Sequence, residues 1–208
     1  MRSQWQRQLQ LSVQATKTQL EQWVSAQQKV ITDVAENESM KLYLAELLAA
    51  KSAVEQTAGE IPAASPTPAT AQNDTLALAT YLRNLLVAEA RRHGFAAPQP
   101  ETLDANIDPV AGSGIAIFDN RGLLVSSTVG FPMRLNLPGE INNNLFNGAP
   151  SPLSPFVFNN KPYAIFTAPV RSVQMDDDAP PIGFVVGMRE LDASFTSILE
   201  SPAEAVET

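Results

Sequence analysis

The sequence predicts an α+β fold with a long N-terminal helix and a five-stranded antiparallel sheet. Two observations predict these parts. Residues 4–57 contain neither glycine nor proline and consist mainly of strong helix formers. From residue 114 onward the chain carries five short runs rich in β-branched and aromatic residues, each bounded by turn signals. The two halves of the chain therefore differ in secondary structure.

Residues 1–58 are predicted to form one long helix or two collinear ones. Its apolar residues recur at steps of three, four or seven, so they draw one stripe that must pack on another surface. The pattern falters at residues 37–39, where we expect a kink with Asn37 or Ser39 capping the second half. The stripe comprises Trp5, Leu9, Val13, Leu20, Trp23 or Val24, Val30 or Ile31, and Val34.

A proline-rich linker or surface loop is predicted at residues 59–74, because Pro62, Pro66 and Pro68 interrupt helical structure. A second helix is predicted at residues 75–93, with Asp74 or Thr75 as its cap. Basic residues in its last turn and a glycine directly after it are typical of a helix C-terminus.

The sheet is predicted at residues 114–190. The first two strands flank the turn sequence "DNRG" at residues 119–122, in which the Asp119 side chain can stabilise the turn. A long segment, 129–154, separates the second strand from the third, and Pro138 is well placed to begin a short helix there. Asp192 is predicted to begin a closing helix within residues 191–200. The predicted strands are 114–118, 123–128, 155–160, 162–172 and 182–191.

Composition argues against several classes of partner. The net charge is −8, and the basic residues are scattered, so no basic face is expected for nucleic acid or anionic lipid. The chain has no cysteine, which excludes disulfides and cysteine-ligated metals. It contains no apolar run of transmembrane length and no signal-peptide pattern. Because helical pattern starts abruptly at the first residues, we expect a segment of a longer protein.

Catalytic signatures are weak, and we predict no enzymatic activity, cofactor or metal for this segment. The single histidine, His93, is better explained as a helix cap than as a base. Ser113 lacks the surroundings of a nucleophile elbow. Three successive carboxylates at residues 176–178 could bind calcium, but they lack the glycine and distal glutamate of an EF-hand loop, so an exposed hairpin tip is the better interpretation.

Four stretches carry a resemblance to a known family. They are "LATYLRNLL" (78–86), "GIAIFDNRGLLVSST" (114–128), "YAIFTAPVRS" (163–172) and "PIGFVVGMRELDASF" (181–195). In these stretches the sequence resembles the extracytoplasmic PAS-like sensor domains known as Cache or PDC domains. The resemblance implies that the long N-terminal helix packs along the back of the sheet and that residues 75–200 form the PAS-like unit.

The resemblance also implies a function. Such domains are the periplasmic parts of bacterial inner-membrane receptors, here most simply a histidine kinase, with a diguanylate cyclase or chemoreceptor as other outputs. We therefore expect a small-molecule ligand, which could be an anion, a homodimer through the N-terminal helix, and a helix shift passed across the membrane. The alternative is a non-enzymatic coiled-coil or protein-interaction module without a pocket. Charged residues on the helix are too sparse for clean heptad pairing, which favours the sensor.

Five residues are candidate ligand contacts. Arg134 lies in the segment expected to roof the pocket and could bind a carboxylate, although a solvated loop arginine is the simpler alternative. Amino-acid binders of the family also carry a tyrosine and a Trp-Tyr pair in this region, and only the arginine has a counterpart here. Tyr163 and Phe166 alternate on the fourth strand, so they face opposite ways and either could pack instead on the long helix. The remaining candidates are Ser127, a strand-end hydroxyl, and Arg171, near the end of the fourth strand.

Overall fold

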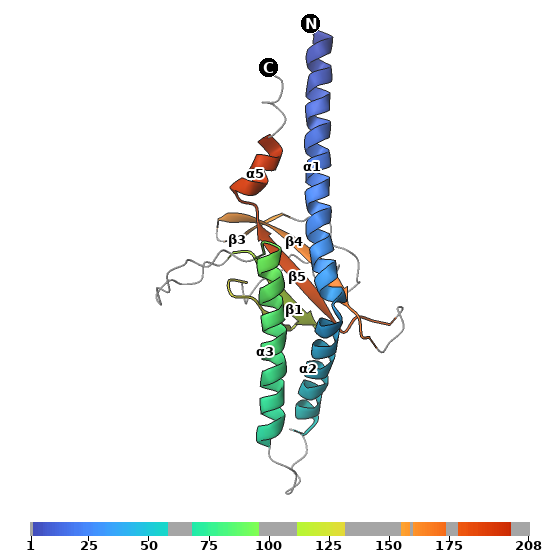
Figure 1. Cartoon of the computed structure of the whole chain (residues 1–208), viewed down its shortest axis with the longest axis vertical. Helices are drawn as coiled ribbons and strands as arrows, with labels where there is room; N and C mark the ends of the chain where they lie inside the picture. Colours follow the sequence, from blue (N-terminus) through green and yellow to red (C-terminus); the bar gives the residue numbers. More distant parts are fainter. Residues whose placement is uncertain are drawn as a thin grey trace.

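The computed structural model describes residues 2–57, 68–95, 112–131, 155–158, 160–173 and 179–200. It confirms the predicted α+β architecture, with three long helices beside one antiparallel sheet (Figure 1). The predicted short helix after Pro138 and the carboxylates at 176–178 lie outside the described residues. The helices are α1 (Arg2–Glu36), α2 (Glu38–Thr57), α3 (Pro68–Arg92) and α5 (Ala193–Glu200). The strands are β1 (Gly114–Asp119), β2 (Leu124–Ser127), β3 (Phe156–Phe158), β4 (Lys161–Val170) and β5 (Gly183–Glu190).

The five strands pair in the order β2-β1-β5-β4-β3, and every neighbouring pair is antiparallel. The first hairpin and the last three strands are joined into one sheet by β1 and β5, which pair from Gly114 with Met188 to Asp119 with Gly183. A five-stranded antiparallel sheet in this order, with long helices against it, is PAS-like. The predicted fold class is therefore confirmed.

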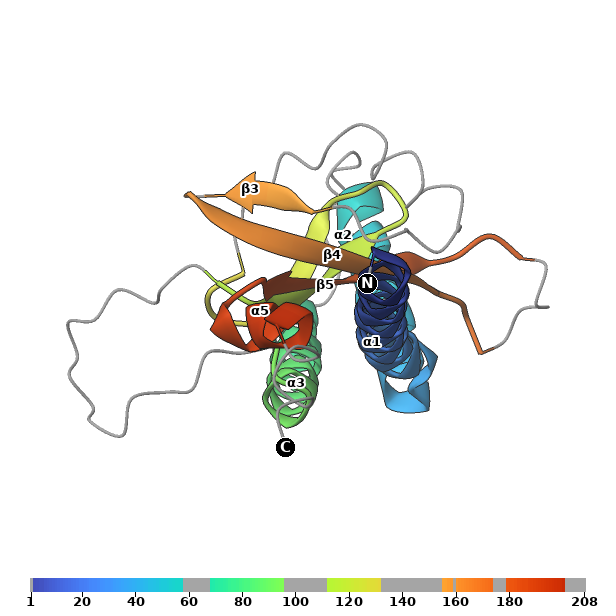
Figure 2. The same cartoon turned by 90° about the horizontal axis from the view of Figure 1, so that it is seen from above.

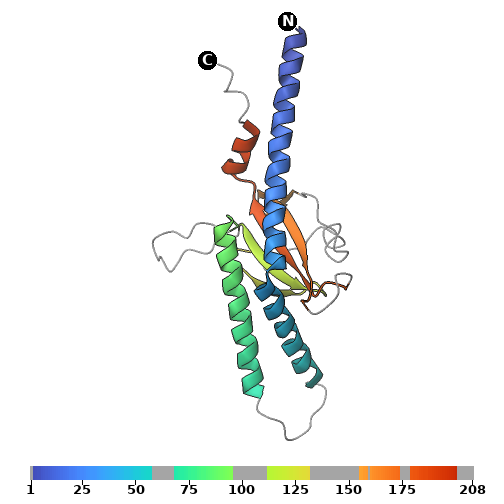
Figure 3. The same ribbon diagram turned by 45° about the vertical axis from the view of Figure 1, so that its right-hand side comes forward.

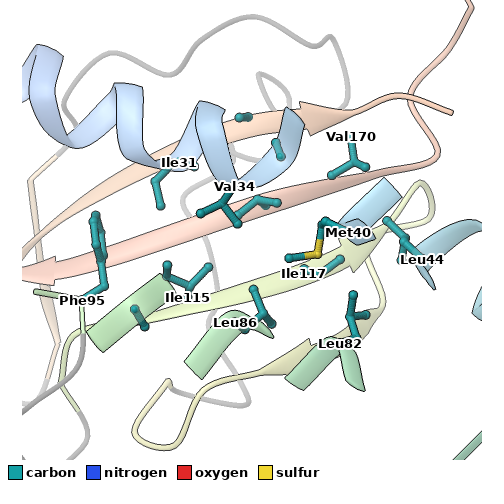
Figure 4. Packing of buried hydrophobic residues seen from close by; sticks show 14 of the residues in the cluster. Ile31, Val34, Met40, Leu44, Leu82, Leu86, Phe95, Ile115, Ile117 and Val170 are labelled. Atoms are coloured by element: carbon teal, nitrogen blue, oxygen red, sulfur yellow. The ribbon is translucent and has the colours of Figure 1, made fainter. Parts of the chain in front are cut away.

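Three helices cover one face of the sheet, which we call the helix face. The second half of α1 lies across β4 and β5, while α3 lies against β1 and β2 (Figure 2). Apolar residues from α1, α2 and α3 pack there against alternate residues of the strands (Figure 4). The largest fully buried residues of this core are Phe95, Phe166, Ile31, Met40, Leu44, Leu47, Leu82, Leu86, Ile115 and Ile117.

The predicted kink in the N-terminal helix is a full break at Asn37. Its side-chain Oδ1 accepts a hydrogen bond from the Met40 backbone N–H at 3.2 Å, so Asn37, and not Ser39, caps α2. The break lets α2 leave the line of α1 and run beside α3, and this helix pair extends beyond the sheet (Figure 3). Of the two predicted alternatives, the structure has two helices, and they are not collinear (Figure 3).

The second predicted helix begins earlier than expected, at Pro68 and not at residue 75. Proline lacks an N–H, and the first helical position needs none, so Pro68 can start the helix, and the residues after it are compatible with helical structure. At the other end Gly94 adopts a φ of 74°, and the Phe95 N–H donates to the Ala90 carbonyl at 2.8 Å. This left-handed glycine ends the helix as predicted.

The turn between β1 and β2 is held by the Asp119 carboxylate. Its Oδ1 accepts hydrogen bonds from the backbone N–H groups of Arg121 at 2.9 Å and Leu123 at 2.8 Å. Gly122 follows with a φ of 79°, a conformation that glycine adopts without strain. At the other end of the sheet, Asp192 Oδ1 accepts a hydrogen bond from the Phe195 N–H at 3.3 Å, so Asp192 caps α5 as predicted.

Candidate functional site

The sheet has a second apolar face, opposite the helices, which we call the distal face. Its side chains come from alternate positions of β1, β4 and β5, together with Phe131. Tyr163 is fully buried there although it is the largest side chain of the group. The buried residues of this face are Ala116, Phe131, Tyr163, Ile165, Phe184, Val186 and Met188, with Phe118, Leu124 and Phe158 partly buried around them.

One row of paired residues crosses the distal face from β2 to β4. Ser127 pairs with Ala116, Ala116 pairs with Val186, and Val186 pairs with Thr167. Directly paired residues lie on the same face of a sheet, so the Ser127 and Thr167 hydroxyls belong to the two ends of one row with small or medium apolar side chains between them. Thr167 is almost completely buried, at 2% exposure. The row thus combines two hydroxyl groups with apolar side chains in a largely buried layer, and small-molecule sites combine the same kinds of group.

Tyr163 adds a phenol to the same face, two residue pairs away from this row along β4, with the Ile165–Met188 pair between them. Burial raises the pKa of the Tyr163 hydroxyl above its ordinary value, and the nearby Glu190 carboxylate acts in the same direction. Glu190 itself is paired with Lys161, whose Nζ lies 2.8 Å from its Oε1. The phenol therefore stays neutral well into the alkaline range and can both donate and accept a hydrogen bond.

The raised pKa of Tyr163 leads to a test in alkali. Because the unfolded chain releases this proton first, the free energy of unfolding should fall as pH rises above about 10. The raised pKa of Lys161, which arises first from its hydrogen bond to Glu190, acts in the same direction. In an ultraviolet titration one tyrosine should ionise late, together with unfolding, and Tyr163→Phe should abolish that late phase. Tyr81→Phe, at an exposed position, should leave it in place; its loss there would contradict the assignment.

The structure brings some of the predicted site residues together and separates others. Ser127 and Tyr163 share the distal face. Phe166 lies on the helix face, where its ring contacts Trp23 at 5.8 Å and Phe95 at 6.3 Å between centroids. Arg171 lies just after β4, and its Nη1 donates to the Ala179 carbonyl at 2.9 Å, across the connection between β4 and β5. Whether any of these residues contacts a ligand stays a prediction.

Arg134, the candidate anion contact, lies outside the described residues. Thr167 was missed by the sequence analysis, although the alternation of Tyr163 and Ile165 along β4 places it on their face.

Among the described residues, no group of three or more acidic or histidine side chains is arranged to hold a metal ion. Within the same described part, no helix combines the length and hydrophobicity needed to cross a membrane.

Comparison with known proteins gives little beyond this. No protein-family model matches the chain. No curated protein matches it either. Among solved structures, it is similar to the LOV protein of Rhodobacter sphaeroides, with a TM-score of 0.29 and 20% sequence identity over 45% of this chain and 67% of that one. The PAS-like assignment depends on the strand order and not on this similarity.

Proposed function

We propose that this chain is the ligand-sensing domain of a bacterial transmembrane signalling receptor, of the extracytoplasmic Cache or PDC type. The observation that carries the proposal is the difference in composition between the two faces of the sheet. The helices fill the helix face with apolar side chains, whereas the distal face includes Tyr163, Ser127 and Thr167 among its apolar residues. The ligand would lie over this row, bound mainly by apolar contact and oriented by the hydroxyls.

The arrangement of the terminal helices supports a signalling role. The N-terminal half of α1 and the whole of α5 extend from the sheet toward the same end of the molecule (Figure 1). The helices α1 and α5 meet through Trp23 and Phe195, whose ring centroids are 4.9 Å apart. A ligand-induced change in the sheet would thus move both helices together, and shifts of about 1–2 Å are sufficient for helix signalling. In the parent protein these two helices would lead toward the membrane.

A second copy of the chain is the proposed partner of α1. Trp5, Leu9 and Val13 are 60–70% exposed, and they continue the stripe whose later members pack on the sheet. An apolar stripe that is exposed in the first half of a helix and buried in the second fits a helix that packs on a partner helix through its first half and on its own domain through its second. Sedimentation measurements should show a dimer that the triple change of these residues to glutamine dissociates; a monomer at all concentrations would refute this part.

The ligand proposal is tested by thermal-shift measurements on the isolated chain. Carboxylates, amino acids, polyamines and nucleobases are screened, and we expect one class to raise the melting temperature in a dose-dependent way. Thr167→Val and Ser127→Ala should then weaken the dose response several-fold, since each removes one hydroxyl and keeps most of the apolar contact. Ser25→Ala, on the exposed side of α1, is the matched control and should leave it unchanged. Arg134→Ala asks whether the ligand is an anion.

A protein-interaction module without a ligand is the second candidate, and the exposed stripe of α1 is the observation that favours it. The two candidates differ in one outcome. A stable dimer combined with no stabilising compound in the screen would favour the interaction module and reject a small-molecule site on the distal face.

A further inference from the structure

Five side chains from five separate parts of the chain meet at one end of the helix face. The ring of Trp23, on α1, lies against Phe166 of β4 at 5.8 Å and Phe195 of α5 at 4.9 Å. Phe95, which follows α3, also lies against Phe166, at 6.3 Å. The fifth member is Arg189 of β5. We call this group the Arg189 junction, and it is the place where α5 contacts α1 beside the sheet.

The guanidinium of Arg189 links the group. Its central carbon lies 5.7 Å from the centroid of the Trp23 ring and 6.0 Å from that of Phe95, within the range of cation–π attraction. Its Nη1 donates a hydrogen bond of 2.6 Å to Oε1 of Gln27, a buried residue one turn further along α1. Arg189 therefore contacts α1 twice, four residues apart on the same helical face, and the end of α3 once.

Among the described residues, the close contacts of this cation are with rings and an amide. None of the ion pairs between described residues involves Arg189. Burial lowers the pKa of the guanidinium below its ordinary value, while the charge of Asp192 partly opposes that effect. Rings and a neutral amide are individually weaker partners than a carboxylate, so Arg189 holds β5 against α1 through several contacts acting together.

Arg189 lies just before the chain leaves the sheet and enters α5. It is the next-to-last residue of β5, and α5 begins at Ala193 after its cap Asp192. A side chain that binds β5 to α1 just before α5 begins fixes the direction in which α5 leaves the sheet. Nearby, Gly187 has no side chain, and a Cβ there would collide with Ile31 and Phe95, so α1 lies close to β5 beside the junction.

We propose that Arg189 is a positioning residue that sets the relation of α5 to α1, and that loss of its contacts frees α5 while the sheet stays folded. Trp23 of α1 contacts both Arg189 of β5 and Phe195 of α5, so the contacts of Arg189 with α1 also affect the position of α5. The proposal concerns the isolated chain and needs no ligand, dimer or membrane. Its failure would therefore leave the sensor proposal untouched, and the reverse also holds.

The test is a distance measurement between spin labels on the full chain. The chain has no cysteine, so Gln19→Cys on α1 and Leu199→Cys on α5, both at exposed positions, give a single labelled pair. In Arg189→Gln we expect the α1–α5 distance distribution to broaden about twofold, as for a segment released into local fluctuation. Arg189→Lys keeps the charge but not the planar stacking surface, and it should give an intermediate width.

Two controls make the result decisive. A label pair at Ala49 on α2 and Ala77 on α3, both exposed, reports on the helix pair away from the junction and should keep its width in every variant. Arg83→Gln, an exposed arginine on α3, should change neither pair. An unchanged α1–α5 distribution in Arg189→Gln would overturn the proposal, and so would equal broadening of both pairs, because that would mean general loosening. If Arg189→Gln does not fold, the same two outcomes are judged on Arg189→Lys.

Discussion

Truncation of Phe166 to alanine is expected to lower the free energy of unfolding by about 3–5 kcal/mol, the usual cost of removing a buried phenylalanine ring. Phe166 is 1% exposed on the helix face, and its ring contacts Trp23 of α1 and Phe95 after α3. The cavity would lie where two helices meet the sheet, so rigid elements on both sides would limit its collapse. The effect should therefore be near the upper end of the range.

Urea denaturation followed by circular dichroism measures this change. Phe158→Ala is the matched control, because this phenylalanine lies on the short edge strand β3, is only partly buried and contacts Tyr163 on the distal face. We expect a loss for Phe158→Ala that is less than half as large. A small loss for Phe166→Ala, combined with a weakened response to a stabilising compound, would contradict its role in packing and restore it as a ligand contact.

The sequence predicts those parts of the fold that depend on local periodicity. The two-residue period of β4 correctly places Tyr163 and Phe166 on opposite faces, and the turn chemistry of Asp119 and Gly122 correctly places the first hairpin. Helix caps at Asn37 and Asp192 are local as well. Such features depend on neighbours within a few residues, so a pattern in one sequence is sufficient to predict them.

Other parts depend on contacts between distant residues, which no local pattern contains. The row from Ser127 to Thr167 exists because β1 pairs with β5 and β5 pairs with β4, a register set by the whole sheet. Gln27 and Arg189 are 162 positions apart, and each alone reads as an ordinary polar residue. The direction of α2 after Asn37 is likewise fixed by packing on α3 and not by the cap itself. Only the fold brings these groups together.

Gly183→Ala is expected to destabilise the fold more than Gly187→Ala, although both glycines lie on β5 under the helices. A Cβ on Gly183 would lie 2.5 Å from the backbone oxygen of Phe118, which is fixed by the pairing of β1 with β5, and 3.1 Å from Leu44 Cδ2. A Cβ on Gly187 would meet the side chains of Ile31 and Phe95 instead. Overpacking of a core typically costs about 1–3 kcal/mol, and we expect Gly183→Ala to reach or exceed the upper figure.

The reason for this order is which atoms can move. The Ile31 side chain can change rotamer and the Phe95 ring can tilt, so Gly187→Ala displaces side chains and should cost about 1–2 kcal/mol. The Phe118 oxygen can move only if β1 and β5 separate. Their hydrogen bonds join the first hairpin to the rest of the sheet, so this separation would weaken the sheet at its centre. Chemical denaturation of both variants decides between them, with hydrogen exchange of the β1 amides as a local readout. If Gly187→Ala lowered the free energy of unfolding as much as Gly183→Ala or more, this expectation would be wrong. The packing of α1 on β5 would then be more rigid than the pairing of β1 with β5.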